Sequence, residues 1–209
     1  CRFCSSGRPV LCVEQGKALT TPPEGTPRVH DASGKPLGIF SGCGVMAEYA
    51  TLSVDNLVKI DAKIPLDRAA LVGCAVTTGV GAVFNTARVE PGAAVAVFGC
   101  GGVGLNVVQG AAIAGAERIV AIDTLQEKLD MAKRFGATDT ILARPGEDLA
   151  KLLKKMTGGG PDYALECVGV GALAETAYRA IRRGGKAIVV GVAKAADTAA
   201  IKPMTLVFE

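Results

Sequence analysis

The sequence lacks tryptophan, has 4% aromatic residues and contains one histidine among 209 residues. So few aromatic side chains leave little surface on which nucleic-acid bases could stack. The net charge is only +3, and the charged residues are spread along the chain without a run of one sign. A basic patch is the electrostatic footprint of proteins that bind nucleic acid or anionic membranes. We therefore expect no partner of either kind.

We also expect neither a membrane-spanning run nor a secretory leader. The most apolar stretch that we identify, residues 103–116, is interrupted by Asn106 and Gln109 and is too short to span a bilayer. The chain begins with Cys-Arg-Phe-Cys, which does not resemble a signal peptide. The seven cysteines are an odd number, which suits a reducing compartment better than a set of disulfides. We expect a cytoplasmic protein.

What is present is 49% hydrophobic residues with 27 glycines, a texture typical of α/β proteins with buried parallel strands. The first seventy or so residues differ, because they hold most of the prolines and a polar loop. Within them, residues 48–60 predict two short strands around a turn at Asp55 and Asn56. Residues 67–88 then predict two helices with a break near Gly73. The early part of the chain is therefore expected to be loop-rich, antiparallel β structure.

After Pro91 a regular alternation of strands and helices begins. The hydrophobic pattern predicts strands at 94–98, 118–122, 139–142, 163–166 and 186–190, separated by helices at 103–114, 126–135, 148–156 and 172–182. Strands joined by helical crossovers run parallel, so the pattern predicts a doubly wound α/β sheet. It stops one strand short of the six-stranded dinucleotide fold, and residues 201–209 predict no closing element. We expect a fragment that lacks both ends.

A glycine-rich loop follows the first predicted strand. Gly99 allows the tight turn, Gly101 lets the backbone approach a pyrophosphate, and Gly104 allows close packing of helix and strand. Asp123 ends the next strand, where a carboxylate binds ribose hydroxyls and repels a 2′-phosphate. The pattern predicts NAD rather than NADP, with Lys128 as a further ribose contact. The structural alternatives are an ordinary glycine turn, a strand-end aspartate and a solvated lysine.

Cysteines occur in two further segments of interest. Cys1, Cys4 and Cys12 would be three of the four ligands of a tetrahedral metal site. Cys74 stands at the start of a predicted helix, with Thr78 one turn further along on the same face. Taken alone, a cysteine in that position is more often a small buried residue than a ligand.

Together these segments resemble the zinc-containing medium-chain alcohol dehydrogenases. The similarity is carried by CRFCSSGRPVLC, LVGCAVTTGVGAV, FGCGGVGL, AIDTLQEK, DYALECVG and IVVGV, in the order of that family. The resemblance implies an NAD-binding Rossmann domain at 76–209, incomplete at its C-terminus. It implies before it, at 1–75, part of a GroES-like, mostly β catalytic domain with a structural zinc lobe. It also implies hydride transfer between an alcohol or aldehyde and NAD, and a homodimer or homotetramer for the full-length protein.

The resemblance assigns roles to single residues. Cys1, Cys4 and Cys12 match three ligands of the structural zinc, and the fourth would lie upstream. Cys74 matches one ligand of the catalytic zinc, and Thr78 would touch the nicotinamide side of the cofactor. The remaining cofactor contacts that it implies are Gly99, Gly101, Gly102, Val103, Gly104, Asp123, Thr124, Lys128, Cys167, Val168, Val190, Gly191 and Val192. The stretch from Val76 to Gly92 is similar to glutathione-linked formaldehyde and aryl-alcohol branches.

Three residues fall outside the family pattern. His30 is expected on the surface, Cys43 is expected to be small and buried, and Cys100, inside the glycine loop, is expected to be prone to oxidation. A non-catalytic NAD-binding or redox-sensing module stays an alternative. A zinc-free quinone reductase would lack the cysteine cluster and the Cys74 ligand, and a zinc ribbon would need a second CxxC.

This chain alone is expected to bind NAD weakly and to oxidise no alcohol. Zinc held by three thiolates is weaker than zinc held by four, so residues 1–30 are expected to be the least stable part.

Overall fold

A computed structural model describes residues 1–13, 29–38, 44–50, 52, 54 and 57–208. The chain forms two compact units, Cys1–Ala62 and Lys63–Glu209. This division lies close to the predicted domain boundary after residue 75, and that boundary itself stays a prediction.

The first unit contains little regular structure in its described residues. A short helix α1 (Arg2–Ser5) and a single 3-10 turn η1 (Pro9–Leu11) lie at its start. Exposed His30 forms an isolated antiparallel bridge with Pro36, and the described residues of this unit form no strand. The turn predicted at Asp55 and Asn56, like Cys43, lies outside the described residues. The GroES-like part of the fold therefore stays a prediction.

The second unit is built on a five-stranded parallel sheet. Its strands are β1 (Ala94–Phe98), β2 (Arg118–Asp123), β3 (Asp139–Leu142), β4 (Tyr163–Glu166) and β5 (Lys186–Val189). Their order in space is β3-β2-β1-β4-β5, so the chain reverses direction across the sheet between β1 and β4. The doubly wound Rossmann architecture is confirmed, and its ligand crevice is expected at the carboxyl ends of β1 and β4.

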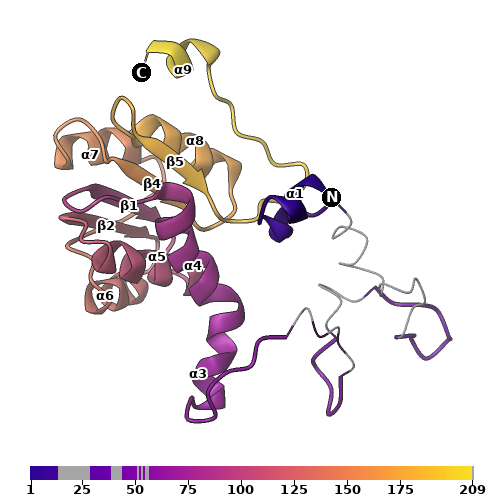
Figure 1. Ribbon diagram of the computed structural model, residues 1–209. Helices are drawn as coiled ribbons and strands as arrows, with labels where there is room; N and C mark the ends of the chain where they lie inside the picture. Colours follow the sequence, from indigo (N-terminus) through magenta and orange to yellow (C-terminus); the bar gives the residue numbers. More distant parts are fainter. Residues whose placement is uncertain (14–28, 39–43, 51, 53, 55–56, 209) are drawn as a thin grey trace. The chain divides into compact units, whose positions relative to one another are not determined.

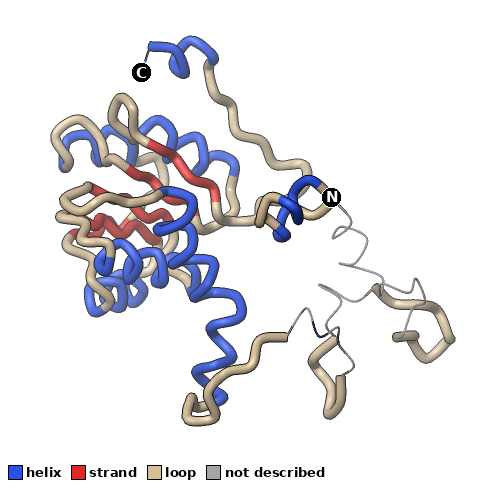
Figure 2. Tube along the Cα trace, viewed as in Figure 1, coloured by secondary structure: helices blue, strands red, loops and turns tan. Residues whose placement is uncertain are grey.

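Four helices cover the two faces of this sheet. They are α5 (Gly102–Ile113), α6 (Gln126–Arg134), α7 (Leu149–Met156) and α8 (Gly171–Ala180). Figure 1 shows α5 and α6 on one face and α7 and α8 on the other, and Figure 2 shows the strands enclosed between them. Side chains alternate accordingly along β1: Val95 and Val97 belong to one buried cluster, and Ala96 and Phe98 belong to the other.

One continuous helical run leads into the sheet, and the predicted break at Gly73 is wrong. The run consists of α3 (Leu66–Leu71), η4 (Val72–Val76), α4 (Thr77–Gly81) and η5 (Ala82–Ala87). A glycine inside a helix costs only about 1 kcal/mol relative to alanine, so the run continues through Gly73 as a π-helical segment. Arg88, with a left-handed φ of 56°, ends the run.

Among the described residues this run is also the longest apolar helix, whereas the sequence analysis had chosen residues 103–116 as the most apolar stretch. Leu66–Ala87 has 22 residues and a mean hydropathy of 1.5, enough by length and composition to cross a membrane. Its second half behaves as a core helix of a globular domain instead, since Val83 and Ala87 are fully buried against the sheet. A last helix, α9 (Pro203–Phe208), occupies the segment for which no closing element was predicted.

Candidate functional site

The glycine loop between β1 and α5 forms a tight turn that is closely packed at Gly99 and Gly104. Gly99 has a φ of +87°, which side-chain-bearing residues rarely adopt, and its N–H donates to the Ile122 carbonyl at 2.8 Å. A Cβ on Gly104 would lie 1.8 Å from the Gly99 carbonyl oxygen, so helix and turn are in direct contact. By contrast, a Cβ on Gly101 would meet no atom within 4 Å. The backbone at Gly101 is therefore open to a ligand.

A cavity of about 260 Å³ lies beside this loop. It joins the carboxyl ends of β1, β2 and β4, where the sheet order reverses. Seven of the predicted cofactor contacts line it: Gly99, Gly101, Asp123, Thr124, Lys128, Cys167 and Val168. Its apolar lining, which the sequence analysis missed, comes from Phe98, Ile122, Ala143, Leu149 and Leu173. The only signal for these residues is their place at strand ends and helix starts.

Asp123 connects the second strand with the glycine loop. Its Oδ2 accepts a hydrogen bond from the Cys100 N–H at 2.8 Å, and its Oδ1 accepts one from the Leu125 N–H at 3.0 Å. The Lys128 Nζ lies 3.9 Å from Oδ2. A carboxylate offers about four lone-pair sites, so Asp123 keeps acceptor capacity for hydroxyl groups in the cavity. The residue holds the loop in shape as well as facing the ligand site.

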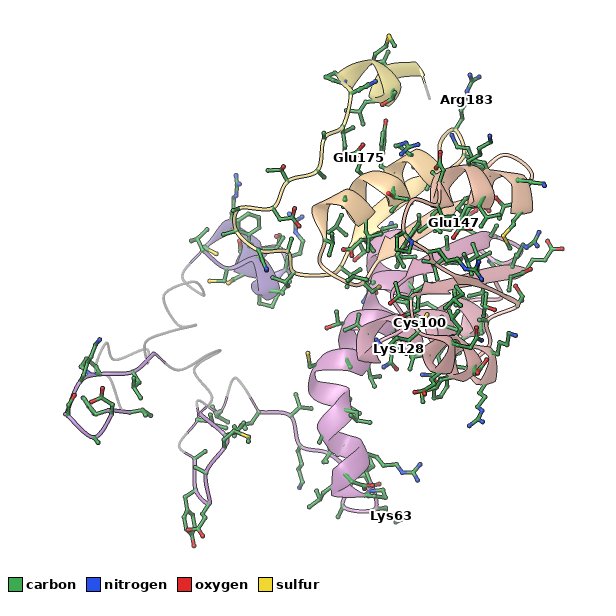
Figure 3. All side chains as sticks on the ribbon, turned by 180° about the vertical axis from the view of Figure 1, so that it is seen from behind. Lys63, Cys100, Lys128, Glu147, Glu175 and Arg183 are labelled. Carbon is green, nitrogen blue, oxygen red and sulfur yellow. The ribbon has the colours of Figure 1, made fainter. Side chains whose placement is uncertain are left out.

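Cys100 is not the reactive thiol that its position suggested. It is 1% exposed, its sulfur lies near the Ile122 carbonyl, and Figure 3 shows it close to Lys128. Burial, and next the charge of Asp123, raise the pKa of this thiol to about 12. Since the thiolate is the form that reacts, burial and this shift disfavour oxidation of Cys100, against the expectation from its position. They disfavour a redox-sensing role through this thiol as well.

Glu166, at the carboxyl end of β4, is a residue that the sequence analysis missed. It is completely buried, and its Oε1 accepts hydrogen bonds from the N–H groups of Val168 at 2.8 Å and Gly169 at 2.7 Å. The neighbouring Cys167 thiol has its pKa raised to about 12 by burial and by the Glu166 charge. A charged residue at the end of the apolar strand YALE was the available signal.

The three predicted contacts after β5 lie beside the β4 loop rather than on the cavity. The N–H groups of Val190 and Gly191 both donate to the Glu166 carbonyl. A Cβ on Gly191 would lie 2.1 Å from the nitrogen of Gly169, and Val192 is 94% exposed. The two loops therefore form one packed border at this end of the sheet.

Cys74 and Thr78 lie on the helical run, next to the start of α5. Both side chains are exposed, and Ala75 faces Gly102, the first residue of α5. A Cβ on Gly79 would lie 2.6 Å from the carbonyl oxygen of Val103, so α4 and α5 pack in close contact. Within the described part of the chain no group of three metal-ligating side chains includes Cys74. A catalytic zinc takes three protein ligands, so Cys74 by itself does not form such a site.

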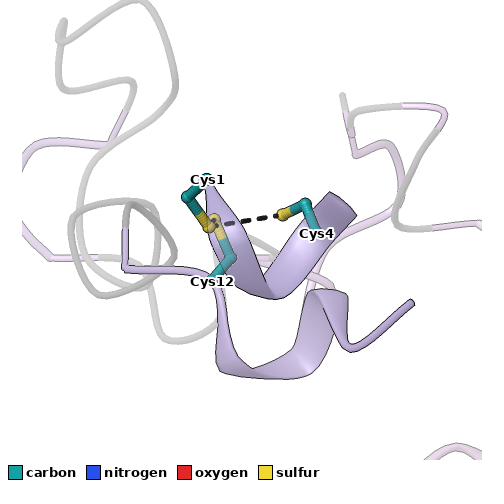
Figure 4. A group of neighbouring side chains, drawn as sticks. All are labelled: Cys1, Cys4 and Cys12. Atoms are coloured by element: carbon teal, nitrogen blue, oxygen red, sulfur yellow. Dashed lines mark hydrogen bonds between the residues drawn. The ribbon is translucent and has the colours of Figure 1, made fainter. Parts of the chain in front are cut away.

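Cys1, Cys4 and Cys12 form a compact thiol cluster in the first unit (Figure 4). The Cys1 sulfur lies 3.7 Å from that of Cys4 and 3.9 Å from that of Cys12. Zinc–sulfur bonds of 2.3 Å at tetrahedral angles place sulfur atoms about 3.8 Å apart. The spacing therefore fits three corners of a zinc tetrahedron. Without metal, the hydrogen bond with Cys12 raises the pKa of the Cys4 thiol.

Comparisons with known proteins agree with this geometry. The chain is 44% identical to an S-(hydroxymethyl)glutathione dehydrogenase of Saccharomyces cerevisiae, over 99% of this chain and 55% of the relative. It is 42% identical to an S-(hydroxymethyl)glutathione dehydrogenase of Synechocystis sp., over 99% of this chain and 57% of the relative. The chain thus spans about half the length of the curated relatives it matches.

Solved structures are similar over the whole chain. An alcohol dehydrogenase zinc-binding domain protein from Burkholderia ambifaria matches with a TM-score of 0.89 and 33% identity, covering 100% of this chain and 57% of the other. Benzyl alcohol dehydrogenase from Acinetobacter calcoaceticus matches with a TM-score of 0.88 and 29% identity. The match covers 100% of this chain and 56% of the other. The family model for zinc-binding dehydrogenases matches residues 102–209, more than half of the chain. Together with the glycine turn and the Rossmann sheet, this match makes the chain a member of the zinc-binding dehydrogenase family.

Proposed function

We propose that this chain carries the NAD site of an oxidoreductase that transfers hydride between an alcohol, or the corresponding aldehyde, and NAD. The observation that carries the proposal is one cavity in which the open backbone at Gly101 and the carboxylate of Asp123 lie together. In a Rossmann domain these two features bind the pyrophosphate and the adenosine ribose of a dinucleotide.

The chain's own groups would bind the cofactor in three places. The N–H groups at the start of α5 point toward the loop and would interact with the pyrophosphate, supported by the helix dipole. Asp123, with Lys128 beside it, would accept hydrogen bonds from the ribose hydroxyls. A 2′-phosphate would bring negative charge toward the Asp123 carboxylate, so NAD is preferred over NADP.

The reacting end of the cofactor would lie toward Thr78 and Val103. Thr78 would contact the nicotinamide, and Val103 would pack behind the ring, with Val190, Gly191 and Val192 at the border of the cleft. When bound, NAD would supply the chemistry as acceptor of the hydride from the alcohol carbon, and the hydroxyl proton would pass to solvent. Gly102 and Thr124 complete the predicted contacts.

Two zinc ions belong to the proposal. Cys1, Cys4 and Cys12 would hold a structural ion, since their spacing fits it. Cys74 would be one ligand of a catalytic ion, together with ligands that the described residues do not supply. Sequence similarity favours S-(hydroxymethyl)glutathione or an aryl alcohol as substrate, because relatives carry those names. The complete protein is proposed to be a cytoplasmic homodimer or homotetramer.

Calorimetric titration of the 209-residue chain with NAD, and separately with NADP, tests the binding step. We expect weak binding of NAD and weaker binding of NADP. A chain that is folded and binds neither nucleotide contradicts the proposal.

Activity is tested separately on the complete protein. NADH formation is measured with S-(hydroxymethyl)glutathione, benzyl alcohol and a primary aliphatic alcohol. Turnover of one of them supports the dehydrogenase. NAD binding without any turnover favours the alternative of a non-catalytic NAD-binding module.

A further inference from the structure

Glu166 is buried in a way that calls for an explanation. Its exposed fraction is 0%, and its Oε2 has no hydrogen-bond partner within the part of the chain that the structure describes. Burying a carboxylate oxygen without a partner costs free energy. An apolar residue of similar size would avoid this cost. The position must therefore bring an advantage elsewhere.

The advantage lies in the two N–H groups that the Glu166 side chain binds, beside the two that its main-chain carbonyl accepts as that of any residue would. Its side-chain Oε1 accepts from Val168 and Gly169, both in the loop after β4. Its main-chain carbonyl accepts from Val190 at 2.8 Å and Gly191 at 3.0 Å, both in the loop after β5. A single residue thus holds the first turns of two neighbouring loops at the carboxyl end of the sheet.

These two loops lie in close contact with each other. Gly169 has a φ of +87°, and a Cβ there would lie 2.4 Å from the Val192 carbonyl oxygen. On the other side, the Val168 side chain reaches the glycine turn, since a Cβ on Gly99 would lie 2.5 Å from its Cγ2. A change in the loop at 167–169 is therefore passed to the turn that lines the cavity.

We infer that Glu166 is a positioning residue for the dinucleotide, acting through Val168 on the glycine turn and through Gly169 on the loop after β5. This inference rests on the proposed NAD site. Glu166 does not line the cavity. Its part is to accept the loop N–H groups, and a neutral acceptor of the same shape does this as well as a carboxylate.

The test compares Glu166→Gln with Glu166→Leu in the 209-residue chain. Glutamine keeps the acceptor oxygen, so we expect NAD affinity to stay within about threefold of that of the unaltered chain. It also buries an N–H₂ group where Oε2 stood, so the melting temperature should fall. Leucine removes the acceptor, and we expect NAD affinity to fall about tenfold or more, as for one to two lost hydrogen bonds. Glu117→Leu, an exposed glutamate before β2, is the control with unchanged affinity.

The inference is overturned if folded Glu166→Leu binds NAD like the unaltered chain, or if both variants lose affinity equally. Should Glu166→Leu not fold, Glu166→Ala removes the same acceptor: about tenfold weaker NAD binding supports the inference, and unchanged binding overturns it.

Amide exchange makes the test independent of the cofactor. In Glu166→Leu, or in Glu166→Ala if leucine does not fold, the amides of Val168 and Gly169 should lose protection, whereas unchanged protection contradicts the anchoring. A third outcome separates the two proposals: the unaltered chain binds no NAD, but substitution of Glu166 still removes the protection of these amides. This outcome contradicts the proposed function and supports the anchoring role.

Discussion

The two units of this chain differ in how far each buries its apolar side chains. In Cys1–Ala62, apolar side chains such as Val10 (76%), Met46 (101%) and Tyr49 (92%) are largely exposed. In Lys63–Glu209, Val95 and Leu165 are completely buried between helices and sheet. Among the described residues, the first unit has a thiol cluster instead of a core, and the second has a core without any metal group. We therefore expect local stability to depend on metal binding in the first unit and on packing in the second.

Removal of zinc should have the largest effect, confined to the first unit. Structural zinc contributes roughly 10 kcal/mol or more in small sites with four ligands, and three thiolates should contribute less. We expect zinc to bind the chain and to protect the amides of residues 1–13, and Cys4→Ser or a chelator to abolish both. The melting transition of the second unit should not change. Hydrogen exchange and metal analysis check this, with Cys74→Ser as control. A coupled loss of stability in both units would contradict the comparison.

Gly104→Ala should disrupt the second unit, because its Cβ would overlap the Gly99 carbonyl oxygen. Overpacking of this kind costs about 1–3 kcal/mol, and NAD binding should be lost with it. Gly101→Ala is the matched variant: its Cβ enters open space, so stability stays and only NAD affinity falls. Thermal unfolding and calorimetry separate the two. Equal stability of both variants would show that the turn is less tightly packed than described.

Asp123→Ala should lower NAD affinity about tenfold and remove the preference over NADP, since hydrogen bonds to charged groups contribute about 1.5–3 kcal/mol. Asp123→Asn keeps an acceptor for the Cys100 N–H and should spare the loop while losing the discrimination. Competition between the two nucleotides measures the effect. Unchanged NAD preference in Asp123→Ala would exclude this carboxylate as the ribose contact.

The smallest effect is expected from the ion pair at the opposite end of the sheet. Arg118 donates two hydrogen bonds of 3.0 Å to Asp139, and this holds the pKa of the Asp139 carboxyl below its usual value. Because the folded pKa is depressed, the pair stabilises the fold above the unfolded pKa of about 3.9 and loses that contribution as the pH falls through the folded value.

Asp139→Asn should therefore cost about 0.5–1 kcal/mol near neutral pH, the scale of a partly exposed pair. Below both pKa values its stability should approach that of the unaltered chain. Denaturant unfolding across this pH range checks the result. A constant difference at all pH values would assign the effect to packing.

The sequence predicted the sheet well because its signals are local. Short apolar runs after glycine turns predicted the bounds of β1, β3 and β4, and parallel order followed from the helical crossovers. Cys100 was misjudged because its burial depends on Asp123 and Ile122, which are more than twenty residues away. Glu166 was missed because two of its partners lie beyond β5. Such tertiary contacts have no local pattern, and the roles of the site residues stay predictions.

The most direct test of the account is hydrogen exchange of the 209-residue chain with and without NAD. The account predicts new protection at residues 99–104, 123–128 and 167–169, and no change at residues 1–13. A larger groove of about 940 Å³, lined by Lys151, Tyr178 and Lys202 among others, offers a competing location. Protection that appears there, or nowhere, would contradict the assignment of the dinucleotide to the glycine turn.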